Sequence, residues 1–248
     1  MIEFCKMQAA GNDYIYLDEA STINVTDWKV FVRKMCDRHF GIGGDGVVTI
    51  DWKANKMIMY NADGSRGVIC GNALRSVAHL AYLRYGREEI VINTDVGPRR
   101  VKRTGSHYVA EMGKGKVLQN LHVEGVDCDL IDVGNLHVVT LDARLSAKDV
   151  CDKIEQAYLH LRDMCNTEVV TLGQDVCASV FERGTGYTMS CGSGACAIAV
   201  CLWQQGIVDP TKSIEIKMPG GTLVVSQREG LLYLEGDAKL VAEGKYYA

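Results

Sequence analysis

The sequence predicts a mixed α/β fold made of two similar halves, each with strands around a central helix. First, short strand-like runs alternate with a few apolar helical segments along the whole chain. Second, 248 residues suit one large domain or two small ones. Third, the pattern Cys-Gly-Asn-Ala at 70–73 returns as Cys-Gly-Ser-Gly at 191–194, and each copy opens an apolar helix that ends at a glycine. The two cysteines are 191 minus 70, or 121, residues apart, which is about half the chain.

The first half is expected to begin with two strands separated by a turn at Asn12-Asp13. Residues 26–37 then have the pattern of a helix, with Thr26 as the expected N-cap. A glycine-rich turn at 41–46 follows, and the Ala- and Leu-rich residues 72–85 predict a buried helix closed by Gly86. The strands expected here are residues 2–7, 14–17, 47–50 and 56–60, with two more inside 90–111.

The second half follows the same plan. Ser146 is the expected N-cap of a helix that runs to Arg162, and residues 193–205 form an apolar helix closed by Gly206. The strands expected here are residues 131–133, 138–141, 169–172, 178–181, 214–218, 222–225 and 231–234. We therefore expect an N-terminal domain at 1–113 carrying Cys70 and a C-terminal domain at 114–236 carrying Cys191. A last strand at about 237–248 is expected to return to the first domain.

Composition and charge exclude several classes of protein. The charge sum is 27 minus 31, or −4, which argues against a general nucleic-acid binder. The longest apolar stretch, 195–203, is too short to cross a membrane, and the N-terminus has no signal-peptide core. Ten cysteines occur without any Cys-x-x-Cys pair, so we expect reduced thiols in a cytoplasmic protein rather than a disulfide scaffold or a metal site.

Two of the cysteines stand where their chemistry would be altered. Cys70 and Cys191 each precede a glycine at the beginning of an apolar helix. A helix N-terminus offers N–H groups and a partial positive charge, which favour a thiolate and can lower its pKa. The same amides bind carboxylates well. Two equivalent sites of this kind predict a thiol on each wall of a cleft.

Two facing thiols suit a proton shift at one carbon atom. One thiolate removes the proton from one face, and the other thiol returns a proton to the opposite face. The stereocentre is thereby inverted, and the pair ends in the mirrored protonation state. The alternative is two buried structural cysteines at helix starts, which is the ordinary reading of either cysteine taken alone.

At this point the chain resembles diaminopimelate epimerases, which work without pyridoxal phosphate. The matching segments run in the family's order: residues 6–7, 11–14, 37–43, 61–65, 70–72, 134–137, 182–184 and 191–196. The resemblance implies two similar domains, each a mostly antiparallel sheet wrapped around a central helix, with the active site between them. It also implies a homodimer that acts on a small amino-acid substrate in lysine and cell-wall precursor synthesis, with no organic cofactor and no metal.

The resemblance assigns roles to named residues. Cys70 and Cys191 would be the acid and base, and His137 and Glu182 could tune the thiols. The carboxylate at the reacting centre would be held by Gly71, Asn72, Gly192 and Ser193. The substrate, chiefly its distal amino-acid end, would be held by Asn12, Asn61, Asn135, Asn166, Glu182 and Arg183. Taken singly, the asparagines would be read as turn residues, and Glu182-Arg183 as a solvated pair.

The sequence departs from the family's pattern at several places. Leu136 stands where the family usually has proline, Ser193 where it usually has threonine, Ser76 in place of a common cysteine, and Arg66 in place of a common acidic residue. The connection between residues 112 and 131 is also shorter than usual. Leu136 and this connection keep open a related cofactor-independent racemase of another amino acid, such as histidine.

Three other functions are set aside. Residues 41–46 fit G-x-G-x-x-G, but a dinucleotide site needs a strand before the motif and a helix after it, whereas here a helix precedes and a strand follows. A cysteine hydrolase would use one cysteine with a histidine and leave the second without a role. A binding protein without catalysis would not need both cysteines.

Overall fold

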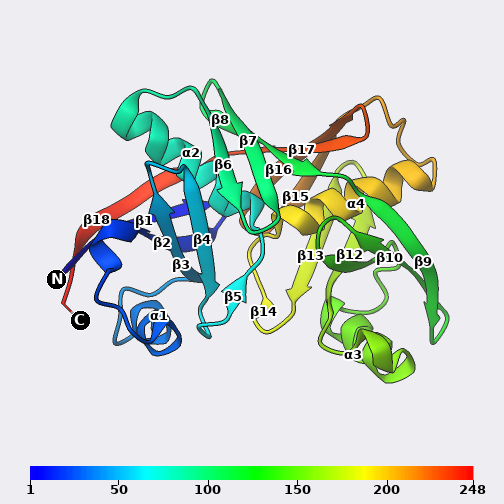
Figure 1. Ribbon diagram of the computed structural model, residues 1–248. Helices are drawn as coiled ribbons and strands as arrows, with labels where there is room; N and C mark the ends of the chain where they lie inside the picture. Colours follow the sequence, from blue (N-terminus) through cyan, green and yellow to red (C-terminus); the bar gives the residue numbers. More distant parts are fainter. Residues whose placement is uncertain (248) are drawn as a thin grey trace. The chain divides into compact units, whose positions relative to one another are not determined.

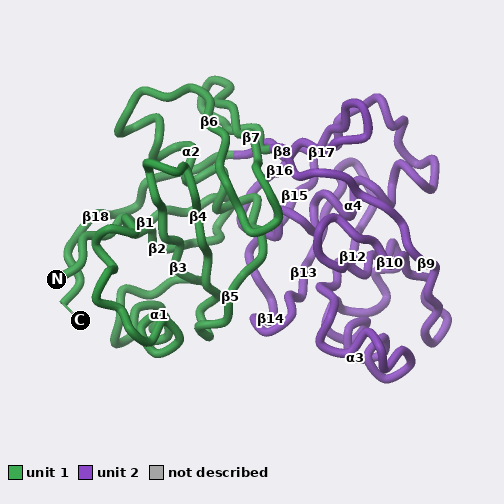
Figure 2. Tube along the Cα trace, in the orientation of Figure 1, with its two compact units in different colours: residues 1–110, 237–248 green, residues 111–236 purple. Residues whose placement is uncertain are grey.

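The computed structural model describes residues 1–247, and Figure 1 labels most of their helices and strands. The chain divides into two compact units (Figure 2). The first consists of residues 1–110 and the C-terminal segment that begins at Asp237, and the second of residues 111–236. None of the helices in this part of the chain has the length and apolar character that a membrane span requires.

In the first unit, strand β1 lies between β2 and β18 and is antiparallel to both. Strand β2 is parallel to β3, β3 is antiparallel to β4, and β4 is parallel to β6, from which β7 and β8 continue antiparallel. The strands are β1 (Ile2–Ala9), β2 (Asn12–Asp18), β3 (Gly46–Asp51), β4 (Lys56–Asn61), β5 (Arg66–Gly67), β6 (Glu89–Thr94), β7 (Gly97–Thr104), β8 (His107–Gly113) and β18 (Lys239–Tyr246), and the last three residues of β8 already belong to the second unit. The helices are α1 (Trp28–Cys36) and α2 (Gly71–Tyr85), with a 3-10 turn at Glu19–Thr22.

The second unit repeats this connectivity. Strand β10 lies between β9 and β11, β11 is parallel to β12, β12 is antiparallel to β13, and β13 is parallel to β15, which continues into β16 and β17. The strands are β9 (Lys116–Val123), β10 (Val126–Asp132), β11 (Leu136–Thr140), β12 (Cys165–Leu172), β13 (Val176–Glu182), β14 (Gly186–Tyr187), β15 (Ile214–Met218), β16 (Gly221–Arg228) and β17 (Leu231–Gly236). The helices are α3 (Ala147–Ala157) and α4 (Gly192–Gln204), with a 3-10 turn at Leu159–Leu161. The expected mixed α/β, mostly-sheet fold is confirmed.

Each unit has one helix that is buried on nearly all sides. Helix α2 packs against β1, β6, β7 and β18, and α4 packs against β10, β11, β12 and β16 of its own unit. The small side chains of both helices, chiefly Ala, Gly, Ser and Cys, let the surrounding strands approach closely. Helices α1 and α3 are amphipathic instead. They bury only one face, α1 through Val32 and Met35 and α3 through Val150 and Ile154.

The helix boundaries differ from the expected ones in two places. Helix α1 begins at Trp28 because the Asp27 carboxylate accepts a hydrogen bond from the Val30 N–H, so Asp27 rather than Thr26 is the N-cap. Helix α3 begins as expected, with Ser146 and Asp149 forming a capping box, but it ends at Ala157 instead of Arg162. Gly86, in the left-handed conformation, closes α2 as expected.

Two hairpins were not resolved from the sequence. Residues 89–113 form three strands where two are expected, and residues 116–132 form the β9–β10 hairpin where only a short strand is expected. Strand β9 is mostly exposed, so its side chains do not show the alternation of a half-buried strand. The hairpin turns at Glu124-Gly125, both with positive φ, the geometry of a type I′ turn.

Candidate active site

Both candidate cysteines are the N-caps of the buried helices. Cys70 precedes α2 and Cys191 precedes α4, and both have extended backbone conformations. The Cys70 sulfur accepts a hydrogen bond from the Ala73 N–H at 3.5 Å, and the Cys191 sulfur accepts one from the Gly194 N–H at 3.3 Å. A thiolate in this position would accept the backbone hydrogen bond that the side-chain oxygen of Asp or Ser accepts at a usual helix N-cap. The two halves therefore hold one thiol each, in the same local geometry.

In the first unit, Asn12 connects the residues around Cys70. The Asn12 Oδ1 lies 3.5 Å from the Cys70 sulfur and accepts a hydrogen bond from Asn72 Nδ2 at 3.2 Å. The Asn72 Oδ1 in turn accepts one from the buried Arg75 guanidinium at 2.8 Å. Of the predicted residues of this half, Cys70, Gly71, Asn72 and Asn12 thus lie together. Asn61, at the end of β4, donates to the Ser65 hydroxyl at 3.0 Å.

The glycine-rich loop before β3 positions Asn12. Its Asp45 carboxylate accepts hydrogen bonds from Asn12 Nδ2 at 2.7 Å and from the Asp13 N–H at 3.1 Å. Arg38 bridges the carboxylates of Asp13 and Asp45, which keeps these two acidic groups side by side. Because helix α1 precedes the loop and strand β3 follows it, its context is not that of a dinucleotide site. Asp45 was not singled out from the sequence.

In the second unit, the corresponding groups surround Cys191. The Cys191 sulfur lies 3.4 Å from the Ser193 hydroxyl, which accepts a hydrogen bond from Asn135 Nδ2 at 3.3 Å. The Asn135 Oδ1 is buried without a hydrogen-bond partner among the described residues. Asn135 follows Gly134 just before β11, as Asn12 follows Gly11 at the beginning of β2. The two asparagines thus hold equivalent positions beside the two cysteines.

The pKa of Cys191 departs from the expected direction. Burial, followed by the negative charges of Glu182 and Glu168, raises the pKa of this thiol well above its ordinary value. The Ser193 hydroxyl and the Gly194 N–H lower the pKa, as expected at a helix N-terminus, but less than burial raises it. Cys191 is therefore a thiol at neutral pH, which suits the acid of an acid-base pair.

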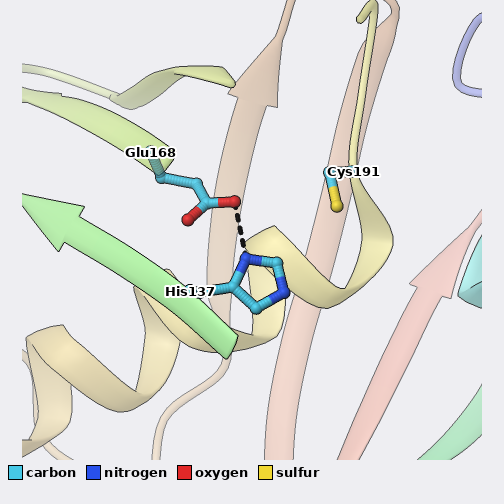
Figure 3. Close-up of side chains that lie close together, drawn as sticks. All are labelled: His137, Glu168 and Cys191. Carbon is cyan, nitrogen blue, oxygen red and sulfur yellow. Dashed lines mark hydrogen bonds and ion pairs between the residues drawn. The ribbon is translucent and has the colours of Figure 1, made fainter. Parts of the chain in front are cut away.

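A buried histidine and a buried carboxylate lie beside Cys191 (Figure 3). His137 Nδ1 is 2.7 Å from Glu168 Oε1, and both side chains are completely buried. One ring nitrogen of His137, one carboxylate oxygen of Glu168 and the Cys191 sulfur, the atoms that could bind a metal ion, all lie within 4.8 Å of one another. Such a set could also bind a metal ion, because His137 Nε2 and Glu168 Oε2 have no hydrogen-bond partner among the described residues and a bound metal would itself deprotonate the thiol. The His137–Glu168 hydrogen bond also suits proton transfer.

The remaining predicted residues lie at one end of β12 and β13. Asn166 Oδ1 accepts a hydrogen bond from the Arg183 N–H at 3.0 Å. The Arg183 guanidinium donates to the Asp163 carbonyl at 3.1 Å, and Glu182 accepts a hydrogen bond from the Thr188 hydroxyl. Asn166 is also paired with His137 in the parallel register of β11 and β12. The second unit therefore gathers Asn135, His137, Asn166, Glu182 and Arg183 on neighbouring strands.

Glu168 is the residue of this group that sequence reasoning missed. It lies in the apolar strand β12 among Thr167, Val169 and Val170, all of them buried. An acidic residue in such a strand is a signal in itself, because glutamate is almost never fully buried without a partner. The partner could not be named from the sequence, since His137 is 31 residues away.

Iodoacetamide is expected to alkylate Cys70 faster than Cys191 in the folded protein. Cys70 is partly exposed, whereas Cys191 is buried and has a raised pKa. Because each pKa unit reduces the thiolate fraction at neutral pH about tenfold, Cys191 should react at least about tenfold more slowly and gain rate as the pH rises. Peptide mass spectrometry over time measures both rates. The exposed Cys177 is the internal reference, and equal rates at Cys191 and Cys177 at neutral pH would contradict the expectation.

Comparison with known proteins agrees with the resemblance in sequence. The chain is 28% identical over 267 residues to "Diaminopimelate epimerase" of Rickettsia akari (strain Hartford), covering 99% of this chain and 97% of that protein. It is also 28% identical over 267 residues to the protein of the same name from Rickettsia bellii (strain OSU 85-389), covering 99% and 98%.

Solved structures share the fold at low sequence identity. A predicted epimerase from Pseudomonas aeruginosa matches with a TM-score of 0.79 at 12% identity, covering 100% of both chains. A hydroxyproline epimerase from Agrobacterium vitis, with bound trans-4-hydroxy-L-proline, matches with a TM-score of 0.71 at 13% identity, covering 98% of this chain and 91% of that one. The model of the family "Diaminopimelate epimerase" matches residues 4–118 and 130–241, nearly the whole chain. The chain therefore belongs to the diaminopimelate epimerase family, whose members are isomerases.

Proposed function

We propose that this protein interconverts LL- and meso-diaminopimelate by proton transfer at one α-carbon, with Cys70 and Cys191 as the acid-base pair. The observation that carries the proposal is the equivalent placement of the two thiols, each as the N-cap of a buried helix in its own unit. One thiolate takes the α-proton from one face of the carbon, and the other thiol delivers a proton to the opposite face. No organic cofactor takes part in the proposed reaction.

The helix N-termini supply the electrostatic stabilisation that such a reaction requires. As the α-proton leaves, negative charge develops on the neighbouring carboxylate. The N–H groups of Gly71, Asn72, Gly192 and Ser193 belong to the first turns of α2 and α4, at the positive end of each helix dipole. In the proposed complex these amides hold the carboxylate and stabilise the developing charge.

The substrate's distal end is assigned to the residues at the ends of the strands. Arg183 can bind a carboxylate through two parallel hydrogen bonds, and Asn61, Asn135 and Asn166 can donate or accept. Glu182 offers a carboxylate for an ammonium group. The buried Asn135 Oδ1 without a partner supports this assignment, because a bound donor would satisfy it.

The burial of Cys191 supports an assignment of the two roles. Because burial and the negative charges of Glu182 and Glu168 raise the pKa of Cys191, we assign Cys191 as the resting thiol and Cys70 as the base of the first turnover. After inversion the two thiols have exchanged their protonation states. A proton must then move from Cys70 to Cys191 before a second turnover in the same direction.

Two further proposals concern the compartment and the oligomeric state of the protein. All ten cysteines are free, which fits the reducing cytoplasm. The family resemblance supports a homodimer, which sedimentation velocity would test.

A racemase of another amino acid, such as histidine, is the second candidate. Leu136 replaces the family's usual proline and packs against the apolar core of the second unit. The family model also leaves residues 119–129, the hairpin between β9 and β10, unmatched. Both departures lie in the unit that carries the proposed distal site.

Proton exchange in D₂O distinguishes the two candidates. The purified protein, with reductant, is given LL-diaminopimelate and, separately, L-histidine, L-lysine and L-proline. We expect loss of the α-proton NMR signal and inversion with diaminopimelate alone, and no inversion by the Cys70→Ala and Cys191→Ala variants. Turnover of another amino acid only would favour the second candidate, and no turnover with any of them would contradict both.

A further inference from the structure

The surroundings of the two cysteines differ at two buried positions. Asn12 and Asn135 hold equivalent positions, so Tyr14 in β2, two residues after Asn12, corresponds to His137 in β11, two residues after Asn135. The parallel registers pair Tyr14 with Gly46 and His137 with Asn166. Two residues further along, Val48 in β3 therefore corresponds to Glu168 in β12. The first half thus has tyrosine and valine where the second has histidine and glutamate.

The helix that follows each cysteine also differs between the two halves, at a residue that lies beside Glu168 in the second half. Counting from Cys70 and Cys191, Ala73 corresponds to Gly194. A Cβ atom on Gly194 would lie 2.5 Å from Glu168 Oε1, which is too close for two non-bonded atoms. The first half tolerates alanine at this position because Val48, not a glutamate, occupies the strand. Gly194 is thus the residue that makes room for the Glu168 carboxylate under the helix N-terminus.

The buried pair is only partly satisfied. His137 Nδ1 and Glu168 Oε1 bind one another, but His137 Nε2 and Glu168 Oε2 are buried without a hydrogen-bond partner among residues 1–247. Leaving such groups unpaired costs stability, so a retained pair of this kind points to a function. If the Glu168 carboxylate carries the charge, it can only accept a hydrogen bond, and the shared proton then resides on Nδ1 and leaves a lone pair on Nε2.

We propose that Glu168 is a positioning residue that holds His137 with its proton on Nδ1, so that the lone pair on Nε2 is left to take the proton of Cys191 when that thiol must become the base. His137 and Cys191 lie in one buried cluster whose ligand atoms are within 4.8 Å of one another, and the transfer requires the Cys191 side chain to turn toward Nε2. The S–H bond of Cys191 breaks, an N–H bond forms at Nε2, and Glu168 stays ionised. This inference rests on the proposed function, because it gives Cys191 a way to exchange roles with Cys70.

The charges around Cys191 explain why the thiol needs this support. Two carboxylates face it, Glu168 from β12 and Glu182 from β13, and both oppose a second negative charge on the sulfur. An imidazolium at His137 places a positive charge next to both the thiolate and Glu168. The carboxylate in turn stabilises the imidazolium, the role that a buried acid has beside the histidine of a catalytic triad. In the first half, Tyr14 and Val48 offer no such proton acceptor.

The first experiment locates the proton on the His137 ring and does not depend on enzyme activity. Long-range ¹H–¹⁵N NMR of the full-length protein identifies which ring nitrogen of His137 carries hydrogen, with His137→Gln used for assignment. We expect the Nδ1–H form in the unsubstituted protein. We expect a shift toward the Nε2–H form in Glu168→Val, which cannot accept the Nδ1 hydrogen. An Nε2–H form in the unsubstituted protein would overturn the proposal.

The second experiment separates charge from packing. Glu168→Gln keeps the shape and a hydrogen-bond acceptor but removes the charge, and we expect kcat to fall about 100-fold in the direction of inversion that uses Cys191 as the base, with KM little changed. The double variant Glu168→Val/Gly194→Ala copies the packing of the first half and should remain folded with a loss at least as large. The exposed Glu215→Gln in β15 is the control and should keep full activity.

The outcomes distinguish failure of this inference from failure of the proposed function. If the unsubstituted protein does not turn over diaminopimelate, the proposed function fails, and the tautomer measurement still decides whether Glu168 positions His137. If it turns over diaminopimelate and Glu168→Gln does so at the same kcat in both directions of inversion, the inference fails and the proposed function stands.

Discussion

Replacing either Cys70 or Cys191 with alanine is expected to abolish the inversion of diaminopimelate. Inversion needs a proton donor on one face of the α-carbon and an acceptor on the other, and each unit supplies one thiol. A positioned acid or base contributes about 10²- to 10⁴-fold, and because no second route to inversion remains, the loss of kcat in each single variant should lie near the upper end of this range, at about 10⁴-fold. Chiral chromatography of the product over time measures the loss.

The two variants should remain folded, and a matched control separates chemistry from stability. Cys70 and Cys191 are helix N-caps, so alanine removes a capping contact worth about 1 kcal/mol, which a folded domain tolerates. Cys177→Ala, at an exposed thiol in β13, should retain full activity. Normal inversion by either the Cys70 or the Cys191 variant would remove that residue from the mechanism.

Gly46→Ala is expected to lower the free energy of unfolding by about 3 kcal/mol, because the backbone at this position has no room for a methyl group. A Cβ atom would lie 2.2 Å from the Tyr60 carbonyl oxygen and 2.5 Å from the Tyr14 ring. Strand β3 would have to move away from β2 or β4. Since Asp45 precedes Gly46 and holds Asn12, activity should fall as well. Urea denaturation followed by circular dichroism measures the stability.

Gly173→Ala is the control for the glycine substitution. The nearest atom to a Cβ there is the Asp175 carbonyl oxygen at 4.0 Å, an ordinary contact. Alanine at such a position changes stability by about 1 kcal/mol or less, in the stabilising direction, because it restricts the unfolded chain. Equal stability of the two variants would show that β3 can shift at little cost.

The elements that could be predicted from the sequence are those that local patterns determine. The helices α2 and α4 follow from their apolar composition and glycine ends, and both begin within one residue of the expected position. The hairpin of β9 and β10 escaped prediction because most of β9 is exposed and its polar residues resemble a loop. Its turn at Glu124-Gly125 requires positive φ at a residue that is not one of the usual turn formers.

The candidate site could be named only as far as its residues belong to recognisable motifs. The sequence indicated Cys70 and Cys191, but not that burial outweighs the helix N-terminus in setting the pKa of Cys191. Asp45 and Glu168 were missed because each acts through a partner that is distant in the chain and close only in the folded sheet. Strand register, which brings such partners together, is a property of the tertiary structure.

The return of β18 to β1 has a consequence for the order in which a nascent chain can fold on the ribosome. Residues 111–236 can form their complete unit as soon as they have emerged. The earlier residues must wait, because β1 still lacks its neighbour β18, and the buried Arg75 lacks the Asp237 carbonyl that accepts its Nε–H at 3.2 Å. Contacts between such distant segments form slowly. The part of the protein that is synthesised first is therefore completed last, and its uncovered strand edge is the segment most in need of a chaperone during synthesis.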